Sequence, residues 1–384
     1  MSEYQYYEFL AIDRPLTSEE MSALRTLSTR AHITAVSFTN QYQWGDFKGN
    51  PDELMRRFFD AHVYVANWMT AIFKVRVPIE AISEKTVEVM AVRGVLDFKA
   101  TKTHWVITWS LNESENYDRF GMENGRGWMA RLAPVRDELL SGDMRSLYIG
   151  WLSAVTREMI DDDDMEPLPM EGLADLTQAQ QALAEFLEVD EDMLAGARVG
   201  SPAPQHEATS QKEMDDWLGG LPQDEVRALL KLLLAGKGQQ AERAIKNRFA
   251  AWRRGLQGDR SEAPRRTVGE LRKHAEAAER IRQEQEKREQ ERREIKQRKE
   301  REAYLKALAE NFPKAWKSVQ QSVERGSGLA YKEACRVLAD LSEAYSVHRS
   351  PKIFEQELRK FMTDHMRRKA LIQRLVKAGI WHEK

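Results

Sequence analysis

The sequence predicts an α+β N-terminal domain followed by a mainly α-helical C-terminal half that contains a long charged helix. Strand-like runs rich in aromatic and β-branched residues are confined to residues 1–112. From residue 113 onward, apolar residues recur at the three- and four-residue spacing of amphipathic helices. The middle of residues 267–309 consists almost only of Arg, Lys, Glu and Gln. The 384 residues suffice for two or three domains of ~100–200 residues each.

The α+β domain, residues 1–112, alternates strand-like and helix-like runs. The sequence TSEE, from Thr17 to Glu20, is a capping-box pattern and predicts a short helix. Asn50 followed by Pro51 predicts a second helix start, and we read the whole run "NPDELMRRFFDAHVYVANWM" as that helix. Four or five strands with two helices are expected, and the strand-like runs are 3–12, 33–44, 71–77, 85–92 and 103–111.

Residues 113–198 are expected to form a helical extension of this domain, because their apolar residues follow helical spacing. Residues 199–212, "VGSPAPQHEATSQK", are small, polar and proline-bearing, and we interpret them as a linker. Residues 213–258 read as a segment of short helices separated by glycines.

The long charged helix is expected over residues 267–309, which is ~65 Å at 1.5 Å per residue. Every residue between Ile281 and Ile295 is Arg, Lys, Glu or Gln, whereas a coiled coil needs apolar positions in each heptad. We therefore expect a single solvated helix acting as a spacer, with a coiled coil and a disordered segment as alternatives. Favourable Glu-to-Arg pairs four residues apart are expected for Glu276–Arg280, Glu284–Arg288, Glu289–Arg293 and Glu294–Arg298.

Residues 310–384 regain apolar periodicity and predict a basic domain of three helices. Cys335 is the only cysteine, which excludes an internal disulfide and a multi-cysteine zinc site. Its amphipathic surroundings predict a small core residue. The N-terminus lacks signal-peptide features, and no run approaches ~18 apolar residues, so we expect a cytoplasmic protein without membrane contact.

The formal net charge of −2 hides a division along the chain. Residues 1–200 hold 33 acidic and 19 basic side chains, and residues 201–384 hold 28 acidic and 40 basic ones. This asymmetry predicts either a basic portion that meets an anionic partner or two portions that attract each other. The candidate contacts for anions or nucleic acid are Arg253, Arg254, Arg265, Arg266, Arg367, Arg368, Lys369 and Arg374. The alternative for these residues is a solvated helix face.

The four consecutive aspartates in "MIDDDDMEPLP", Asp161, Asp162, Asp163 and Asp164, follow a predicted amphipathic helix. Carboxylates beyond a helix C-terminus do not stabilise its dipole, and the following prolines favour an extended connection. We read the run chiefly as the exit of that helix. The alternative is an acidic patch that docks a basic partner. A metal site is disfavoured, because consecutive side chains on an extended chain point in alternating directions.

Motifs for chemistry are weak. The eight histidines form no pair at zinc-binding spacing, and no nucleotide-binding or esterase motif occurs. Two "DFK" triplets, Asp46–Lys48 and Asp97–Lys99, could in principle hold magnesium in a nuclease, but surface turns are the better interpretation. We therefore expect no cofactor and no metal, and leave the catalytic residues unassigned.

The runs "YQYYEFLAIDRPLT", "WGDFKGNPDELMRRFF" and "DDDDMEPLPMEGL" resemble a family of uncharacterised bacterial proteins. The resemblance covers the first ~200 residues and implies a bacterial cytoplasmic origin. It implies no activity, cofactor or catalytic residue.

Taken together, these features favour a non-enzymatic interaction or scaffold protein. An α+β domain would bind another protein, and the charged helix would space it from the basic helical domain. The first alternative is a nucleic-acid-associated accessory protein that contacts phosphates through its basic half. The second is an enzyme with a site in the N-terminal domain. The sequence does not predict an oligomeric state.

Overall fold

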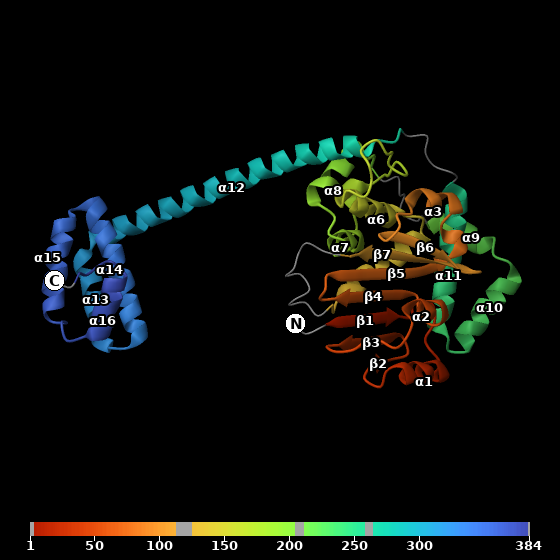
Figure 1. The fold of residues 1–384 in the computed structure, drawn as a ribbon, viewed down its shortest axis with the longest axis horizontal. Helices are drawn as coiled ribbons and strands as arrows, with labels where there is room; N and C mark the ends of the chain where they lie inside the picture. Colours follow the sequence, from red (N-terminus) through yellow and green to blue (C-terminus); the bar gives the residue numbers. More distant parts are fainter. Residues whose placement is uncertain (1–3, 113–124, 204–210, 258–263, 383–384) are drawn as a thin grey trace. The chain divides into compact units, whose positions relative to one another are not determined.

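A computed structural model describes residues 4–112, 125–203, 211–257 and 264–382 (Figure 1). The chain divides into two compact units, Met1–Ile281 and Arg282–Lys384. The first unit contains an antiparallel seven-stranded sheet with helices, and the second is helical, so the predicted fold class is confirmed.

The sheet of the first unit has the strand order β2-β3-β1-β4-β5-β7-β6 (Figure 1). Phe9 on β1 lies opposite Phe38 on β3 and His62 on β4, and Phe73 on β5 lies opposite Trp109 on β7. The strands are β1 (Gln5–Leu10), β2 (His32–Ile33), β3 (Ser37–Tyr42), β4 (Ala61–Ala66), β5 (Thr70–Pro78), β6 (Leu96–Ala100) and β7 (His104–Leu111).

Several sequence-based assignments in this sheet domain were wrong. The described sheet has seven strands where four or five were expected, because the run 33–44 divides into β2 and β3 and residues 96–100, to which no strand was assigned, form β6. The run Ala61–Ala66, expected to continue a helix, forms β4, and it is buried almost throughout between neighbouring strands. The run 85–92, expected as a strand, forms most of helix α3 (Glu84–Met90). The Ser83 hydroxyl accepts a hydrogen bond from the Thr86 amide and caps that helix, which outweighs the β-propensity of its valines.

Helices cover both faces of the sheet. On one face, α1 (Ser18–Leu27) and α2 (Pro51–Arg57) enclose a cluster that includes Phe9, Phe38 and Phe59. Both predicted helix starts are confirmed, through the Thr17 capping box and the Asn50 cap. The other face is covered by α3, α4 (Trp128–Leu132), α5 (Pro134–Leu140), α6 (Arg145–Thr156), α7 (Gln178–Phe186) and α8 (Glu191–Arg198).

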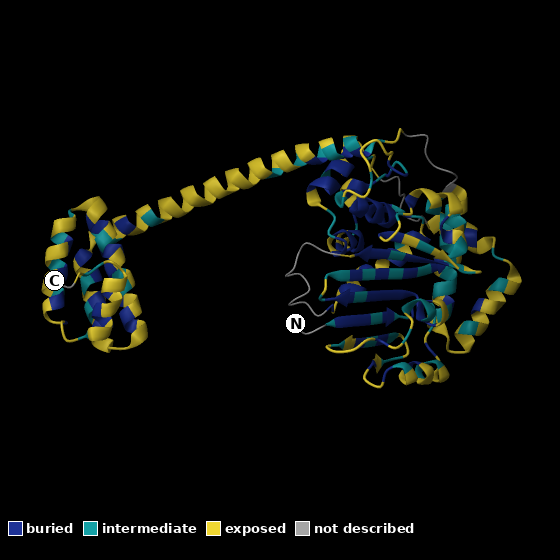
Figure 2. Ribbon diagram, in the orientation of Figure 1, coloured by how far each residue is buried: buried dark blue, intermediate teal, exposed yellow. Residues whose placement is uncertain are grey.

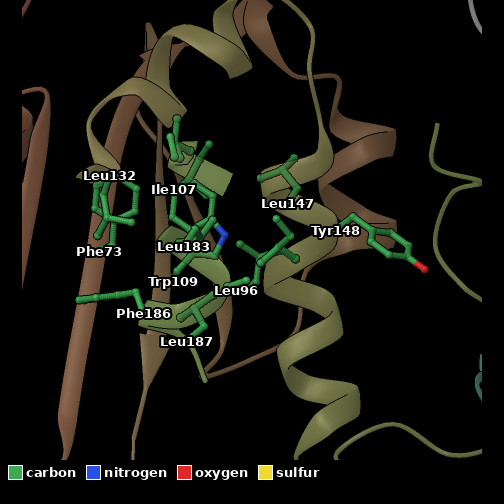
Figure 3. Packing of buried hydrophobic residues seen from close by; sticks show 14 of the residues in the cluster. Phe73, Leu96, Ile107, Trp109, Leu132, Leu147, Tyr148, Leu183, Phe186 and Leu187 are labelled. Atoms are coloured by element: carbon green, nitrogen blue, oxygen red, sulfur yellow. The ribbon is translucent and has the colours of Figure 1, made fainter. Parts of the chain in front are cut away.

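The larger core lies under this second helical layer. Figure 3 shows Trp109 surrounded by Phe73, Leu147 and Leu183, and all four are fully buried. Glycine at position 150 of α6 permits the close approach, since a Cβ there would lie 2.7 Å from the Trp109 ring.

Three further helices of the first unit are α9 (Gln211–Gly219), α10 (Gln223–Leu234) and α11 (Gly238–Gln257). Trp217 of α9 packs edge-on against Phe249 of α11, with ring centroids 5.1 Å apart. Arg243 of α11 pairs with Asp137 of α5 at 2.8 Å, which attaches the segment to the sheet domain. The middle part of the predicted linker 199–212, residues 204–210, lies outside the described residues.

The long charged helix is α12 (Val268–Glu310), as the sequence predicts. Val268 and Leu271 at its start are buried in the core of the first unit, and Leu305 near its end is buried in the core of the second. Residues 283–300 between them are exposed throughout (Figure 2). Three of the four predicted ion pairs form, whereas Arg298 pairs forward with Glu302 instead of back with Glu294.

In the described part of the second unit, four helices follow α12 where three were expected. Val319, Leu338, Met362 and Leu371 form the centre of its core, and Cys335 packs half-buried at its edge. Burial raises the pKa of the Cys335 thiol, which favours the neutral form. The helices are α13 (Phe312–Arg325), α14 (Gly328–His348), α15 (Pro351–Thr363) and α16 (Lys369–Lys377). None of the helices in the described parts of the chain is long and apolar enough to cross a membrane.

Candidate interaction surfaces

Arg266, one of the predicted anion contacts, is bound to a buried carboxylate. Its guanidinium forms two hydrogen bonds with Glu166, at 3.0 and 2.9 Å, and also donates to the Ala197 carbonyl. Glu166 is 1% exposed and also accepts a hydrogen bond from the Tyr148 hydroxyl at 2.9 Å. Figure 3 shows the Tyr148 ring pointing away from Trp109, with its hydroxyl outermost. Arg266 therefore anchors the chain just before α12.

The aspartate run lies against the first turn of α12. The Asp162 carbonyl accepts a hydrogen bond from the Gly269 amide at 2.9 Å, and the Asp164 carbonyl accepts one from Val268 at 2.8 Å. These are amides of a helix N-terminus, which have no partner within the helix. The Asp162 carboxylate pairs with Arg272 at 2.8 Å. Helix α6 ends at Thr156, shortly before the aspartate run, as expected for a helix exit. Asp162 and Asp164 of the run also cap the start of a second helix, α12.

All four aspartate side chains are exposed. Negative charge beside the N-terminus of α12 is favourable for its dipole, so the run has a structural role that reasoning from α6 alone did not include. Within the described parts of the chain, no group of three or more His, Cys, Asp or Glu side chains could hold a metal ion. Docking of a basic partner on these carboxylates stays a prediction.

Of the other predicted basic contacts, Arg254, Arg368 and Arg374 also donate hydrogen bonds to groups of the protein itself, Arg374 to the Ala370 carbonyl. Arg254 donates to the Leu140 carbonyl, and Arg368 donates to the Val323 carbonyl at 2.6 Å and to the Tyr331 hydroxyl at 3.0 Å. Arg253 is half-buried on α11. Arg374 and the remaining members of the set, Arg265, Arg367 and Lys369, are exposed.

An exposed apolar stripe runs along α10, and we call Val226, Leu230, Leu233 and Leu234 the α10 stripe. These side chains are 36%, 52%, 50% and 88% exposed, respectively. On one flank of the stripe, Leu229 is buried and Glu225, one turn earlier, pairs with Arg248 of α11 at 3.2 Å. The helix therefore contacts its neighbour along this flank and leaves the stripe exposed to solvent.

Sequence reasoning did not single out the α10 stripe, although a signal was present. The run "ALLKLLLAG" places five leucines within six residues, so apolar side chains cover more than half the circumference of the helix. One neighbouring helix cannot cover such a surface. Contiguous exposed apolar side chains of this kind mark interaction sites on soluble domains.

A buried charged network lies at one end of the sheet. Asp60, just before β4, is 1% exposed and accepts hydrogen bonds from the Ile12 and Asp13 amides at 2.7 and 2.9 Å. Arg76 pairs with Asp60 at 2.6 Å, and the fully buried Arg136 pairs with Asp13 at 2.8 Å. Burial alone would raise the pKa of Asp60, but the guanidiniums of Arg136 and Arg76 and the two amides hold it below its ordinary value.

This network joins β1, β4, β5 and α5 by opposite charges that face each other. Such compensation suits a structural connection between the sheet and its helical layer. Nearby His104 has a lowered pKa because it is half-buried and close to Arg76.

The two "DFK" triplets do not form one site. Asp46 accepts a hydrogen bond from Gln5 on β1, whereas Asp97 on β6 accepts one from the Gly94 amide. Strands β1 and β6 are separated by three strands of the sheet. Lys99 pairs with Asp52 at 3.4 Å, and the Asp46, Lys48, Asp97 and Lys99 positions are exposed or partly exposed.

No protein-family model, curated protein or solved structure matches the chain. The arrangement and chemistry of its own surfaces therefore carry the functional argument.

Proposed function

We propose that this protein is a non-enzymatic interaction protein. Its first unit binds another protein through the α10 stripe, and α12 joins that unit to a basic helical bundle. The observation that carries the proposal is the exposure of four large aliphatic side chains on a single helix face. Burying such side chains on a partner removes apolar surface from water at roughly 25 cal/mol per Å².

The charged helix supports the linking role. Its exposed stretch, residues 283–300, is balanced by ion pairs along its own surface, such as Arg282–Glu286 at 3.0 Å and Arg298–Glu302 at 3.0 Å. A helix stabilised this way needs no neighbour, and each residue adds ~1.5 Å to its length.

Site-specific photocrosslinking tests the proposal. Benzoylphenylalanine in place of Leu230 is expected to form a discrete heavier adduct in the cells that naturally make the protein. The same group in place of Leu256 is the matched control, because Leu256 is also apolar and 62% exposed but lies on α11. Equal labelling at both positions, or none at Leu230 and Leu233, would contradict the proposal.

Nucleic-acid binding is the second candidate, and the charge of the second unit favours it. Residues 282–384 hold 25 basic and 16 acidic side chains. Arg367, Lys369 and Lys377 are exposed at or next to α16. These residues are the expected phosphate contacts, since Arg254, Arg266 and Arg368 already bind groups of the protein.

Fluorescence anisotropy of the full chain with labelled duplex and single-stranded nucleic acid tests this candidate. Binding at 50 mM salt should weaken steeply by 200 mM, because counterions are released from each contacted phosphate. Reversing Arg367 and Lys369 to Glu should lower the salt dependence by about two phosphate contacts, a change of ~1.8 in the logarithmic slope for duplex DNA. Absence of binding at 50 mM salt removes this candidate.

A further inference from the structure

Helices α9, α10 and α11, residues 211–257, have apolar packing of their own, and we call them the α9–α11 arm (Figure 1). The Phe249 ring of α11 packs against Trp217 of α9 with centroids 5.1 Å apart, and Leu229 and Ala241 are also buried. None of the described side chains of the arm belongs to the two apolar cores on the faces of the sheet. The apolar packing of the arm is therefore separate from that of the sheet domain.

Polar contacts made by three side chains of α11 join the arm to the sheet domain. The pairs are Arg243 with the Asp137 carboxylate at 2.8 Å, Gln239 with the Ile12 carbonyl at 2.9 Å, and Arg254 with the Leu140 carbonyl. The Asp137 side chain is 52% exposed, so salt screens its ion pair with Arg243. Each of these polar groups can bind water instead of its partner. These contacts are therefore weaker attachments than burial in an apolar core.

We infer that the α9–α11 arm swings away from the sheet domain as a folded unit, so that the docked arm is one of two positions in equilibrium. Segments with few buried apolar contacts to the rest of a protein open locally more often than its core does. The released position is a minor state, on the order of 0.1–10% of molecules. Because the arm carries the α10 stripe, its release moves the proposed binding surface relative to the sheet. The movement itself does not depend on the stripe having a partner.

Double electron–electron resonance between two nitroxide labels measures this movement in the purified full chain. The labels replace Ala228 on α10 and Glu88 on α3, which are both exposed and lie on the arm and on the sheet domain, respectively. Cys335→Ala removes the native thiol from the second unit. The unchanged arm should give one main distance, with a longer component that grows as salt is raised from ~50 to ~500 mM.

Removing the three polar contacts should make the longer distance the main component. The variant combines Gln239→Ala, Arg243→Glu and Arg254→Ala. Arg243→Glu alone should increase the longer component several-fold, because it faces the Asp137 carboxylate with a like charge. Adding Asp137→Lys should reverse that increase by restoring opposite charges. A distance distribution that is the same for the triple variant and the unchanged arm overturns the inference.

A second pair of labels, within the arm, separates movement from unfolding. Labels at Ala228 on α10 and at the exposed Leu256 on α11 should give the same single distance in the triple variant and in the unchanged arm. The reason is that the packing of Trp217 on Phe249 lies inside the arm and is not altered. If this distance broadens in the triple variant, the arm unfolds instead of moving as a unit, and the inference is wrong.

Discussion

His62 illustrates how a single side chain couples the sheet to solution pH. Its ring stacks on Phe9 with centroids 3.9 Å apart, and its Nδ1 lies 3.0 Å from the Glu8 carbonyl. Complete burial lowers the pKa of His62 to about 3, so the imidazole is neutral in the folded protein at pH 7. The unfolded chain, with an ordinary histidine pKa of ~6.5, binds the proton more readily.

We therefore expect the first unit to lose stability as pH falls from ~6.5 toward 3, by up to ~1.4 kcal/mol per pH unit from this one proton. The stability that neutral His62 contributes is fully present above the unfolded pKa. It decreases as pH falls below that value, because the folded protein binds the proton less readily than the unfolded chain. His62→Phe should flatten the dependence of melting temperature on pH between 6.5 and 4.5. A wild-type melting temperature that is constant across this window contradicts the burial argument.

Asp60 is expected to be far more important for stability than an exposed carboxylate with a similar ion pair. Asp60→Asn leaves Arg76 and Arg136 buried without full compensation and should cost about 3–5 kcal/mol in the free energy of unfolding. Asp137→Asn is the matched control. It also breaks an Asp–Arg pair, but Asp137 is half-exposed, so a loss below ~1 kcal/mol is expected.

Thermal unfolding followed by the tryptophan signal measures both variants. Because the pKa of Asp60 is lowered, its stabilising contribution exists above an unfolded pKa of ~3.9 and disappears as pH falls through the lower folded value. If Asp60→Asn and Asp137→Asn lower the free energy of unfolding equally, the buried network contributes no more stability than an exposed ion pair, and the prediction is wrong.

At the scale of elements, α12 is stabilised differently at its ends and in its middle. Its N-terminus has a capping box at Thr267, of the same kind as the one at Thr17. The Glu270 amide donates to the Thr267 hydroxyl at 3.1 Å, and the Thr267 amide donates to the Glu270 carboxylate at 2.8 Å. The aspartate carbonyls satisfy further first-turn amides. The middle depends on its own ion pairs, each of which contributes ~0.2–0.5 kcal/mol.

A peptide of residues 267–309 should therefore be helical, monomeric and sensitive to salt. Its circular dichroism should not change between low and high micromolar concentration, and helicity should fall as salt screens the pairs. Helicity that increases with peptide concentration would instead identify a coiled coil.

Elements whose signals are local could be predicted, whereas those decided by distant contacts could not. The caps at Thr17 and Asn50 and the charge pattern of α12 lie within a few residues of the structure they specify. By contrast, the apolar run of β4 suits a buried helix as well as a strand, and only its two neighbouring strands decide. Likewise, Arg266 could not be separated from an exposed phosphate contact, because its partner Glu166 is 100 residues away.

For the whole molecule, part of the opposite charge of the acidic and basic halves of the sequence is neutralised by ion pairs inside the first unit. Arg243, Arg266 and Arg272 come from the basic half and pair with Asp137, Glu166 and Asp162 of the acidic half. The attraction between the two portions, one of the alternatives open from the sequence, therefore accounts for part of the basic charge. The rest remains on the second unit, where residues 282–384 keep nine more basic than acidic side chains.

Among the described residues, the exposed stretch 283–300 should also be cut readily by a protease. Opening this stretch breaks helical hydrogen bonds and surface ion pairs but no tertiary packing, so it should occur far more often than opening of either core. Seven of its residues are Lys or Arg, the residues after which trypsin cleaves. Brief digestion should therefore release two resistant fragments that correspond to the two units, a result that gel electrophoresis and mass spectrometry can check.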